Sequence, residues 1–155
     1  MANGIAQRRY FIPTLGSMLE GLEGLTYPMV RIVTGALLIP HGAQKLFEWF
    51  GGSQAGTAKF FEKFGFIPGM PYVYGIGTLE FFGGICIVLG LFTRLWALLL
   101  IGFMATAVFH VLAPAGFFWT KGGYEFALMW LVLAVVVFIR GGGPFSIDAI
   151  LPKQL

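Results

Sequence analysis

Charged residues are the scarcest class in this sequence. Only 11% of its 155 residues are Asp, Glu, Lys or Arg, whereas an ordinary soluble domain contains about 25%. Hydrophobic residues make up 57% of the chain, and the mean hydropathy is +0.83. A soluble domain of this length cannot bury so much apolar surface, because small domains have a large surface-to-volume ratio. The shortage of charge therefore excludes an ordinary soluble fold and predicts an integral membrane protein.

Other absences exclude several functional classes. Cys86 is the single cysteine, so the chain has no internal disulfide, no CxxC pair and no thiol–disulfide chemistry of its own. The net charge is only +3 and is spread along the chain, which differs from the dense basic patch of a nucleic-acid-binding protein. The sequence also contains no flavin or dinucleotide fingerprint and no close ligand spacing such as HxxxH. We therefore expect no nucleic-acid partner, no metal site and no evident cofactor motif.

Long apolar runs are what the sequence has instead. There are four of them, bounded by glycine, proline or charge, at residues 25–47, 72–91, 95–115 and 124–139. A membrane-spanning helix needs about 20 mostly apolar residues, with a range of about 17–25. Three runs meet this length and the fourth is slightly short. The runs are continuous rather than alternating, which favours helices over barrel strands. The predicted fold class is an all-α integral membrane four-helix bundle.

Two amphipathic stretches predict short interfacial helices in addition. From Leu15 to Leu25, leucine and methionine recur on one helical face, while Glu20 and Glu23 fall on another. This pattern predicts a short interfacial helix before the first span. In the long loop at residues 48–70, three aromatic residues oppose three charged ones, which indicates a second amphipathic segment that lies on the bilayer surface or caps the bundle. These residues are Phe60, Phe61 and Phe64 against Lys59, Glu62 and Lys63.

These elements define three regions of the chain. The predicted regions are an N-terminal segment at residues 1–24, a four-helix domain at residues 25–140 and a C-terminal tail at residues 141–155. With four spans, both termini lie on one side of the membrane, and every arginine near the span ends falls on that side. The basic residues there are Arg8, Arg9, Arg94, Arg140 and Lys153, against Lys45, Lys59, Lys63 and Lys121 opposite. Since basic residues favour the cytoplasmic side, we predict that both termini are cytoplasmic.

Ionisable side chains inside the spans are the candidate functional residues, because charge within a bilayer is costly. They form a candidate intramembrane polar cluster of Arg31, His41, Lys45, Glu80, His110 and Glu125. A rise of about 1.5 Å per residue places all of them except Arg31 in the same half of the membrane. We expect Glu80 to pair with His41 or Lys45. We expect Glu125 to meet His110, Lys45 or Lys121.

The same residues also have purely structural interpretations, so the sequence assigns no catalytic residue. A buried polar pair can serve only to fix the register of packed helices. Lys45 can extend to the membrane surface, and Glu125 suits the start of a helix. A haem held by His41 and His110 is disfavoured, because their estimated depths differ by roughly one helical turn.

Several motifs taken together resemble a known family. Arg31 is followed by HGAQKLF at residues 41–47, and the second span contains EFFGG at residues 80–84. GLFTR follows at residues 90–94 and GGGPFSID at residues 141–148. This combination resembles the DoxX family of small bacterial inner-membrane proteins, over about residues 25 to 148. The resemblance implies a four-helix protein of the bacterial cytoplasmic membrane.

The resemblance also implies an association with redox chemistry. Family members are described as oxidoreductase components; one is a subunit of an archaeal terminal quinol oxidase and of a thiosulfate:quinone oxidoreductase, and a mycobacterial member belongs to a stress-response membrane complex. A quinone and a partner redox enzyme are therefore the implied ligand and partner. We expect a quinone slot in which His41 or Lys45 donates a hydrogen bond, Glu80 relays protons and Phe81 forms an apolar wall.

Three functional hypotheses follow. The first is a quinone-linked oxidoreductase subunit. The second is a non-catalytic membrane anchor or scaffold for a redox or stress-response enzyme, which the missing cofactor motifs favour. The third is a small transporter or permeation protein. Its path would be a row of mostly polar and small residues that recur at intervals of three or four along the first span: Arg31, Thr34, Gly35, Leu38, His41, Gly42 and Lys45. Four helices are few for alternating access, so the third hypothesis requires a homo-oligomer.

Overall fold

A computed structural model describes residues 10–152, and within this range every regular element is helical. The long helices are α1 (Pro13–Phe47), α2 (Gln54–Lys63), α3 (Gly69–Leu89), α4 (Thr93–Thr106) and α5 (Glu125–Arg140). A π-helical turn (Ala107–Leu112) and a 3-10 turn (Ala113–Ala115) continue α4. Further single 3-10 turns lie at Trp49–Gly51, Trp119–Lys121 and Asp148–Ile150.

Three of these helical segments are long and apolar enough to cross a membrane. They are α1, α3 and the continuous segment Thr93–Ala115. α5 is equally apolar in sequence but has 16 residues, which is shorter than a usual span. The prediction of an all-α membrane fold is confirmed.

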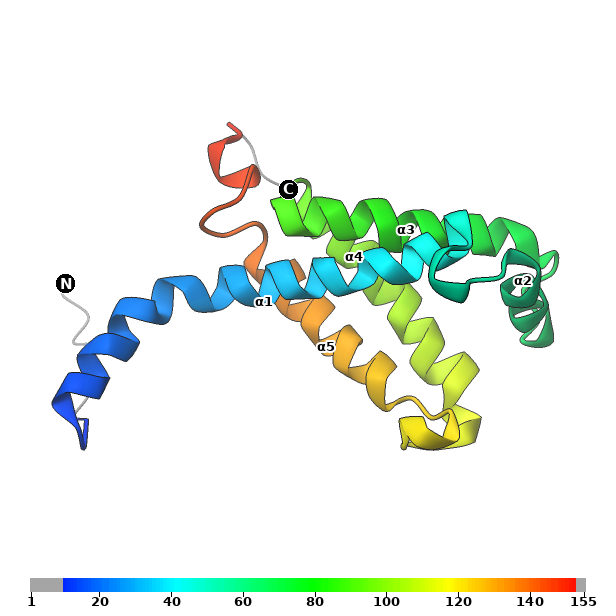
Figure 1. Ribbon diagram of the computed structural model, residues 1–155, viewed down its shortest axis with the longest axis horizontal. Coiled ribbons are helices and arrows are strands. Elements are labelled where there is room, and N and C mark those ends of the chain that lie inside the picture. The colour runs from blue at the N-terminus through cyan, green and yellow to red at the C-terminus, as the bar shows by residue number, and fades with distance from the viewer. Residues whose placement is uncertain (1–9, 153–155) are drawn as a thin grey trace.

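α1 and α3 form the most intimate helix pair, and they run antiparallel side by side (Figure 1). Glycines allow their backbones to approach: a Cβ atom added to Gly35 would lie 2.5 Å from the carbonyl oxygen of Gly84. Further along, Gly42 lies against the backbone of Phe81, so no side chain fits there. Small residues at helix crossings are the usual means of close packing in membranes. Gly77 and Gly84, which flank Glu80 in the sequence of α3, are among the positions where α1 comes close.

The second pair consists of α4 and α5, which diverge from the first pair in Figure 1. The core lies where α1, α3, α4 and α5 meet, and its buried members are aliphatic residues and one methionine, with aromatic side chains packed against them. Its most deeply buried members include Leu38, Ile87, Ala97, Leu100, Ala134 and Val137. α2 packs across one end of α3, where Phe61 and Ala58 cover Val73 in a separate small cluster. The prediction of an amphipathic helical segment within residues 48–70 is confirmed as α2.

The first interfacial helix was predicted as a separate element, and this is wrong. α1 is a single helix of 35 residues that begins at Pro13 and passes through Pro28 and Pro40. A proline removes one backbone hydrogen bond from a helix interior, but Pro28 is buried against the bundle, and packing of the flanking turns keeps the helix continuous. The residues before Tyr27 therefore extend α1 beyond the bundle (Figure 1).

The segment after α5 folds back onto the turn between α3 and α4. The backbone amides of Ile147 and Asp148 donate to the carbonyls of Leu89 and Gly90, at 3.1 and 2.8 Å. Within the predicted tail at residues 141–155, this stretch therefore packs against the bundle. Arg8, Arg9 and Lys153, used above for orientation, lie outside the described residues.

Candidate functional site

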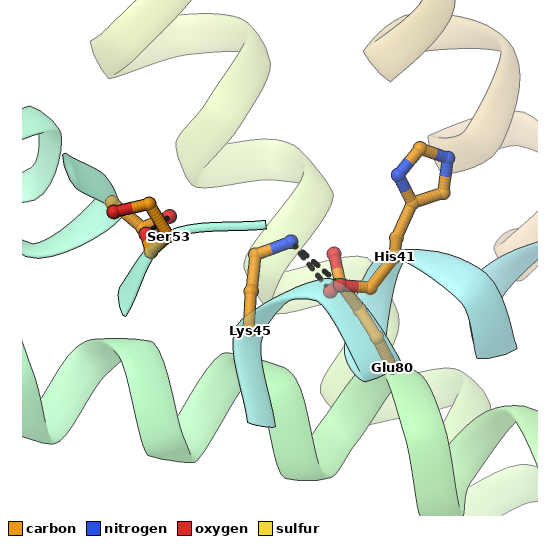
Figure 2. A network of polar contacts seen from close by, with 5 residues as sticks. His41, Lys45, Ser53 and Glu80 are labelled. Carbon is orange, nitrogen blue, oxygen red and sulfur yellow. Dashed lines mark hydrogen bonds and ion pairs between the residues drawn. The ribbon is translucent and has the colours of Figure 1, made fainter. Parts of the chain in front are cut away.

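An ion pair between α1 and α3 is the central feature of the candidate site. Lys45 Nζ lies 2.6 Å from Glu80 Oε2, and the Glu80 side chain is only 5% exposed, while that of Lys45 is 17% exposed. Figure 2 shows the Lys45 ammonium group directed at the Glu80 carboxylate. Of the two partners predicted for Glu80, the structure therefore selects Lys45.

The glycine-lined crossing of α1 and α3 places these two side chains together. Gly42 lets the backbones approach one turn before Lys45, and a Cβ atom at Gly77 would lie 3.0 Å from Lys45 Cβ. Because the helices are antiparallel and close, a long side chain from α1 reaches a carboxylate that is one turn along α3 from Gly77. Because the two helices are so close, the ion pair lies inside the protein.

A cavity of about 440 Å³ adjoins the ion pair, between α2, α3 and α4. Its walls are mostly aromatic and aliphatic, and Lys45 is the only charged residue among them. The other lining side chains include Phe60, Phe61, Phe66, Tyr72, Ile76, Phe103 and Leu112. This volume falls within the range of about 300–1,000 Å³ that is usual for small-molecule sites. The site therefore combines an apolar chamber with one fixed cation.

Hydrogen-bond donors toward this cavity are few. The hydroxyl groups of Thr57 and Thr106 also line it, but they donate to the carbonyls of Ser53 and Gly102, at 2.8 and 2.9 Å. An ammonium group has three N–H donors, and Lys45 directs them to Glu80 and, at 3.4 Å, to the carbonyl of His41. The remaining N–H of Lys45 is the cationic donor available to a ligand.

α2 forms one wall of the cavity, and its N-cap residue sets which side chains face that cavity. Ser53 is its N-cap, and the Ser53 hydroxyl accepts a hydrogen bond from the Gly56 amide at 3.1 Å. This start places Thr57, Phe60 and Phe61 in successive positions on the face that lines the cavity. The aromatic side of the segment predicted from the sequence is thus the wall of the site.

The other residues of the expected quinone slot are distributed differently from the prediction. His41 is exposed, and its imidazole points away from the ion pair in Figure 2. Phe81 packs edge-on against Phe47 and Phe82, with ring centroids 5.2 and 5.1 Å apart, and does not line the cavity. Of the four expected slot residues, only Lys45 lines the cavity directly, and Glu80 supports it from behind.

The predicted contacts of Glu125 are wrong. Its carboxylate accepts a hydrogen bond from the Trp119 amide at 3.2 Å, and no ion pair joins it to Lys121 or Lys45 within residues 10–152. His110 instead lies 3.0 Å from the Phe64 carbonyl and packs against the Phe66 ring. Both side chains lie beside loops, and each makes its hydrogen bond with a backbone group of the neighbouring loop instead of with a side chain of another helix.

Arg31 lies outside this cluster, and it is neither alone nor at the surface. It is 1% exposed, and its guanidinium donates to the carbonyls of Gly142, Phe145 and Val88. It thus fixes the C-terminal segment to the bundle, about 21 Å along α1 from Lys45. Backbone carbonyls have no sequence signature, which is why this role was not predicted.

Asp148 is a second anchor of this segment that sequence reasoning missed. Its carboxylate accepts from the amides of Phe92 and Thr93, at 2.8 and 2.9 Å, and from the Thr93 hydroxyl at 2.6 Å. It therefore caps the first turn of α4, where amide groups have no partner within the helix. Thr93 belongs to the GLFTR motif and Asp148 to the GGGPFSID motif. Their presence in these motifs was the only sequence feature that pointed to the two residues.

The described part of the chain contains no cluster of metal-binding side chains. No three His, Cys, Asp or Glu side chains gather there as a ligand set. His41 and His110 have separate surroundings, on α1 and beside the α2–α3 connection.

The fold and the site define an all-helical membrane protein with an ion pair beside an apolar cavity. The DoxX family model matches residues 28–113, and the chain belongs to the DoxX family. A second model, described as TQO small subunit DoxD, matches residues 72–155. The family assignment made from the sequence motifs is confirmed.

Two curated relatives cover most of this chain. An uncharacterized protein of Haemophilus influenzae is 32% identical over 122 residues, which is 77% of this chain and 85% of that protein. A Bacillus subtilis protein named "Putative oxidoreductase CatD" is 32% identical over 124 residues, which is 77% of this chain and 82% of that protein. No solved structure matches this chain.

Proposed function

We propose that this protein is the membrane subunit of a quinone-linked oxidoreductase and that it holds a quinone head group in the cavity between α2, α3 and α4. One observation carries the proposal: a lysine ammonium group, held by a buried carboxylate, stands at the wall of an otherwise apolar and aromatic chamber. A small-molecule site typically has this form, with mostly apolar walls and few polar groups.

The chemistry of the walls suits a planar ring with carbonyl groups at its edge. Phe61, Phe66 and Phe103 offer ring faces and edges for stacking. The remaining N–H of Lys45 is a donor for one carbonyl oxygen, and a charged donor makes a stronger hydrogen bond than a neutral one. Glu80 keeps that donor in place, since it holds the ammonium group from the side away from the cavity.

Quinone reduction consumes electrons and protons in equal number, and the protein has residues for only one of these tasks. Lys45 and Glu80 form a connected pair that can pass a proton to the cavity, with Glu80 as the proton carrier. Electrons come from a partner enzyme in this proposal, because the chain carries no flavin or dinucleotide motif and has one cysteine.

The relatives support the redox part of the proposal. The DoxD model carries the name of a small subunit, and the Bacillus subtilis relative carries an oxidoreductase name. A protein named as a subunit works with a larger partner, which agrees with the need for an external electron donor. We place this protein in the bacterial cytoplasmic membrane with both termini in the cytoplasm and α5 as a short fourth crossing.

Cavity filling tests the proposal directly. Gly102 lines the cavity and has nothing within 4 Å of the position of an added Cβ, so the leucine of Gly102→Leu has room at its Cβ and occupies part of the chamber. Gly75 on α3 has the same open surroundings but does not line the cavity, and Gly75→Leu is the matched control. We expect Gly102→Leu to bind decylubiquinone about tenfold more weakly than the unmodified protein, equivalent to about 1.4 kcal/mol, in calorimetric titration in detergent.

A second variant tests the donor. Lys45→Met combined with Glu80→Gln removes the ammonium group while leaving no buried charge unpaired. We expect purified protein to carry extractable quinone, and this double variant and Gly102→Leu to carry much less than Gly75→Leu. Equal quinone content in all of them would contradict the proposal. Protein that is free of quinone but copurifies with an enzyme would favour the anchor hypothesis instead.

A further inference from the structure

The N-terminal part of α1 is left without a partner in the chain. From Tyr27 to Phe47, α1 packs on the bundle, and these 21 residues measure about 31 Å, which equals the thickness of a bilayer hydrocarbon core. Residues 13–26 extend the same helix by about 21 Å beyond this length. Figure 1 shows this part running out past the other helices. Among the described residues, Tyr10 packs on Gly16, and the large apolar side chains of this part stay exposed.

This extension carries a regular apolar stripe. Apolar residues recur along α1 at alternating intervals of three and four, and the stripe consists of Leu15, Met18, Leu22, Leu25, Met29, Ile32 and Ala36. The first six are 40% to 62% exposed. The residues that α1 buries in its own bundle, such as Arg31 and Thr34, lie on another face. The stripe therefore points outward along both parts of the helix.

An interval of 3.5 residues is the repeat of two helices wound around each other, and here it continues over three heptads. Lipid chains impose no such repeat on the residues that face them. If the straight helix crosses the bilayer between Tyr27 and Phe47, the residues that precede Tyr27 lie outside the hydrocarbon core. Leu15 and Leu22 therefore need an apolar surface other than lipid. A second helix with the same repeat provides one.

Charge permits that second helix to be α1 of another copy. Glu20, Glu23 and Arg31 are the charged residues between positions 15 and 36, and none lies in the stripe or directly beside it. Like charges of two copies therefore do not face each other across the seam. Gly21 flanks the stripe and has nothing within 4 Å of an added Cβ, which permits close approach of a second backbone.

We infer that the protein forms a homodimer in which the α1 helices of two copies pair in parallel along this stripe. Both copies have the same orientation in the membrane, so the two-fold axis runs along the membrane normal. A seam of 22 residues is about 33 Å long. The interface would bury on the order of 1,200 Å² in total, which reaches the range of stable dimers.

Disulfide cross-linking tests the register of this pairing. In a Cys86→Ala background, single cysteines are placed in the stripe (Leu15→Cys, Leu22→Cys) and off it (Glu20→Cys, Glu23→Cys). A disulfide requires Cα atoms within about 7 Å, so oxidation in proteoliposomes of phosphatidylethanolamine and phosphatidylglycerol should link the first two variants only. The product has twice the 17.0 kDa chain mass.

A charge in the seam gives an independent measurement. Leu22→Lys should convert the dimer to a monomer in light scattering of detergent-solubilised protein, whereas Glu23→Lys should not. Both positions are exposed, so neither change disturbs the bundle. Cross-linking that is absent, or equal at positions 22 and 23, would overturn the inference. So would stripe thiols that resist cross-linking yet are shielded from water-soluble maleimide, since the extension then lies on the bilayer surface.

Discussion

The contact between Lys45 and Glu80 shows how much one pair of side chains depends on the helices that carry them. Glu80 is buried, and among residues 10–152 its ion-pair partner is the Lys45 ammonium group, which also stands at the cavity wall. A buried ion pair adds little net stability, but removing one partner leaves an uncompensated charge in a poorly solvated place. The pair therefore matters most for holding Lys45 at one position.

The difference between an intact pair and a single buried charge predicts the outcome of a double-mutant cycle. Glu80→Gln or Lys45→Met alone should each lower the free energy of unfolding by about 3 kcal/mol, with the Lys45 ammonium somewhat relieved by its partial exposure. The combined variant should recover most of that loss, because no charge remains unpaired. Equilibrium unfolding in mixed detergent micelles measures the cycle, with Glu20→Gln at an exposed position of α1 as the control. Two harmless single changes would contradict the pairing.

At the scale of elements, the crossing of α1 and α3 decides the geometry of the site. Glycines at positions 35, 42 and 84 bring the backbones so close that an added Cβ atom would meet carbonyl or amide groups of the other helix, whereas at Gly77 it would meet the side chains of Leu46 and Lys45 at 3.0 Å. Backbone atoms cannot move aside as a flexible side chain can. The crossing is therefore intolerant of larger residues at positions 35, 42 and 84.

Gly35→Val is the sharpest probe of this crossing. Its Cβ would lie 2.5 Å from the Gly84 carbonyl oxygen and 2.8 Å from the Val88 amide nitrogen, so the helices must separate. We expect a loss of about 1–3 kcal/mol in the free energy of unfolding and weaker quinone binding, since separation also moves Lys45 away from Glu80. Gly75→Val, with open space around its Cβ, should change neither quantity by much. Thermal unfolding and ligand titration on the same samples compare the two variants.

For the whole molecule, polar groups gather at two ends of an apolar bundle. Lys45 and Glu80 lie at one end. Arg31 and Asp148 fasten the C-terminal segment at the other. Positions 31 and 45 on α1 differ by fourteen residues, about 21 Å along the helix. The hydrophobic core, which includes Leu38 of α1, lies between the two groups.

This separation predicts that the two ends contribute independently to stability. Asp148→Ala should cost about 2 kcal/mol, because it removes the cap of α4. Combined with Lys45→Met, its effect should add within about 0.5 kcal/mol, as is usual for distant sites without a shared partner. Unfolding of the two single variants and the double variant measures this. A clear deviation from additivity would show that the bundle couples its two ends.

The sequence by itself determined that the chain belongs in a membrane and that its fold is all-α. Scarce charge and long apolar runs predict membrane helices for any chain, and helical rise alone predicts that Lys45 and Glu80 lie in the same half of the membrane. The family follows from motifs, and the comparisons confirm it. These inferences need only composition and local periodicity.

The tertiary structure decided which of the polar residues meet and where a chamber forms. The cavity depends on how α2 lies over α3 and α4, and its walls come from segments as far apart in sequence as Lys45 and Leu112. Arg31 binds backbone carbonyls, Glu125 and His110 bind nearby loops, and α1 continues past its expected start. Such choices follow from the packing of distant segments, for which local sequence carries no signal.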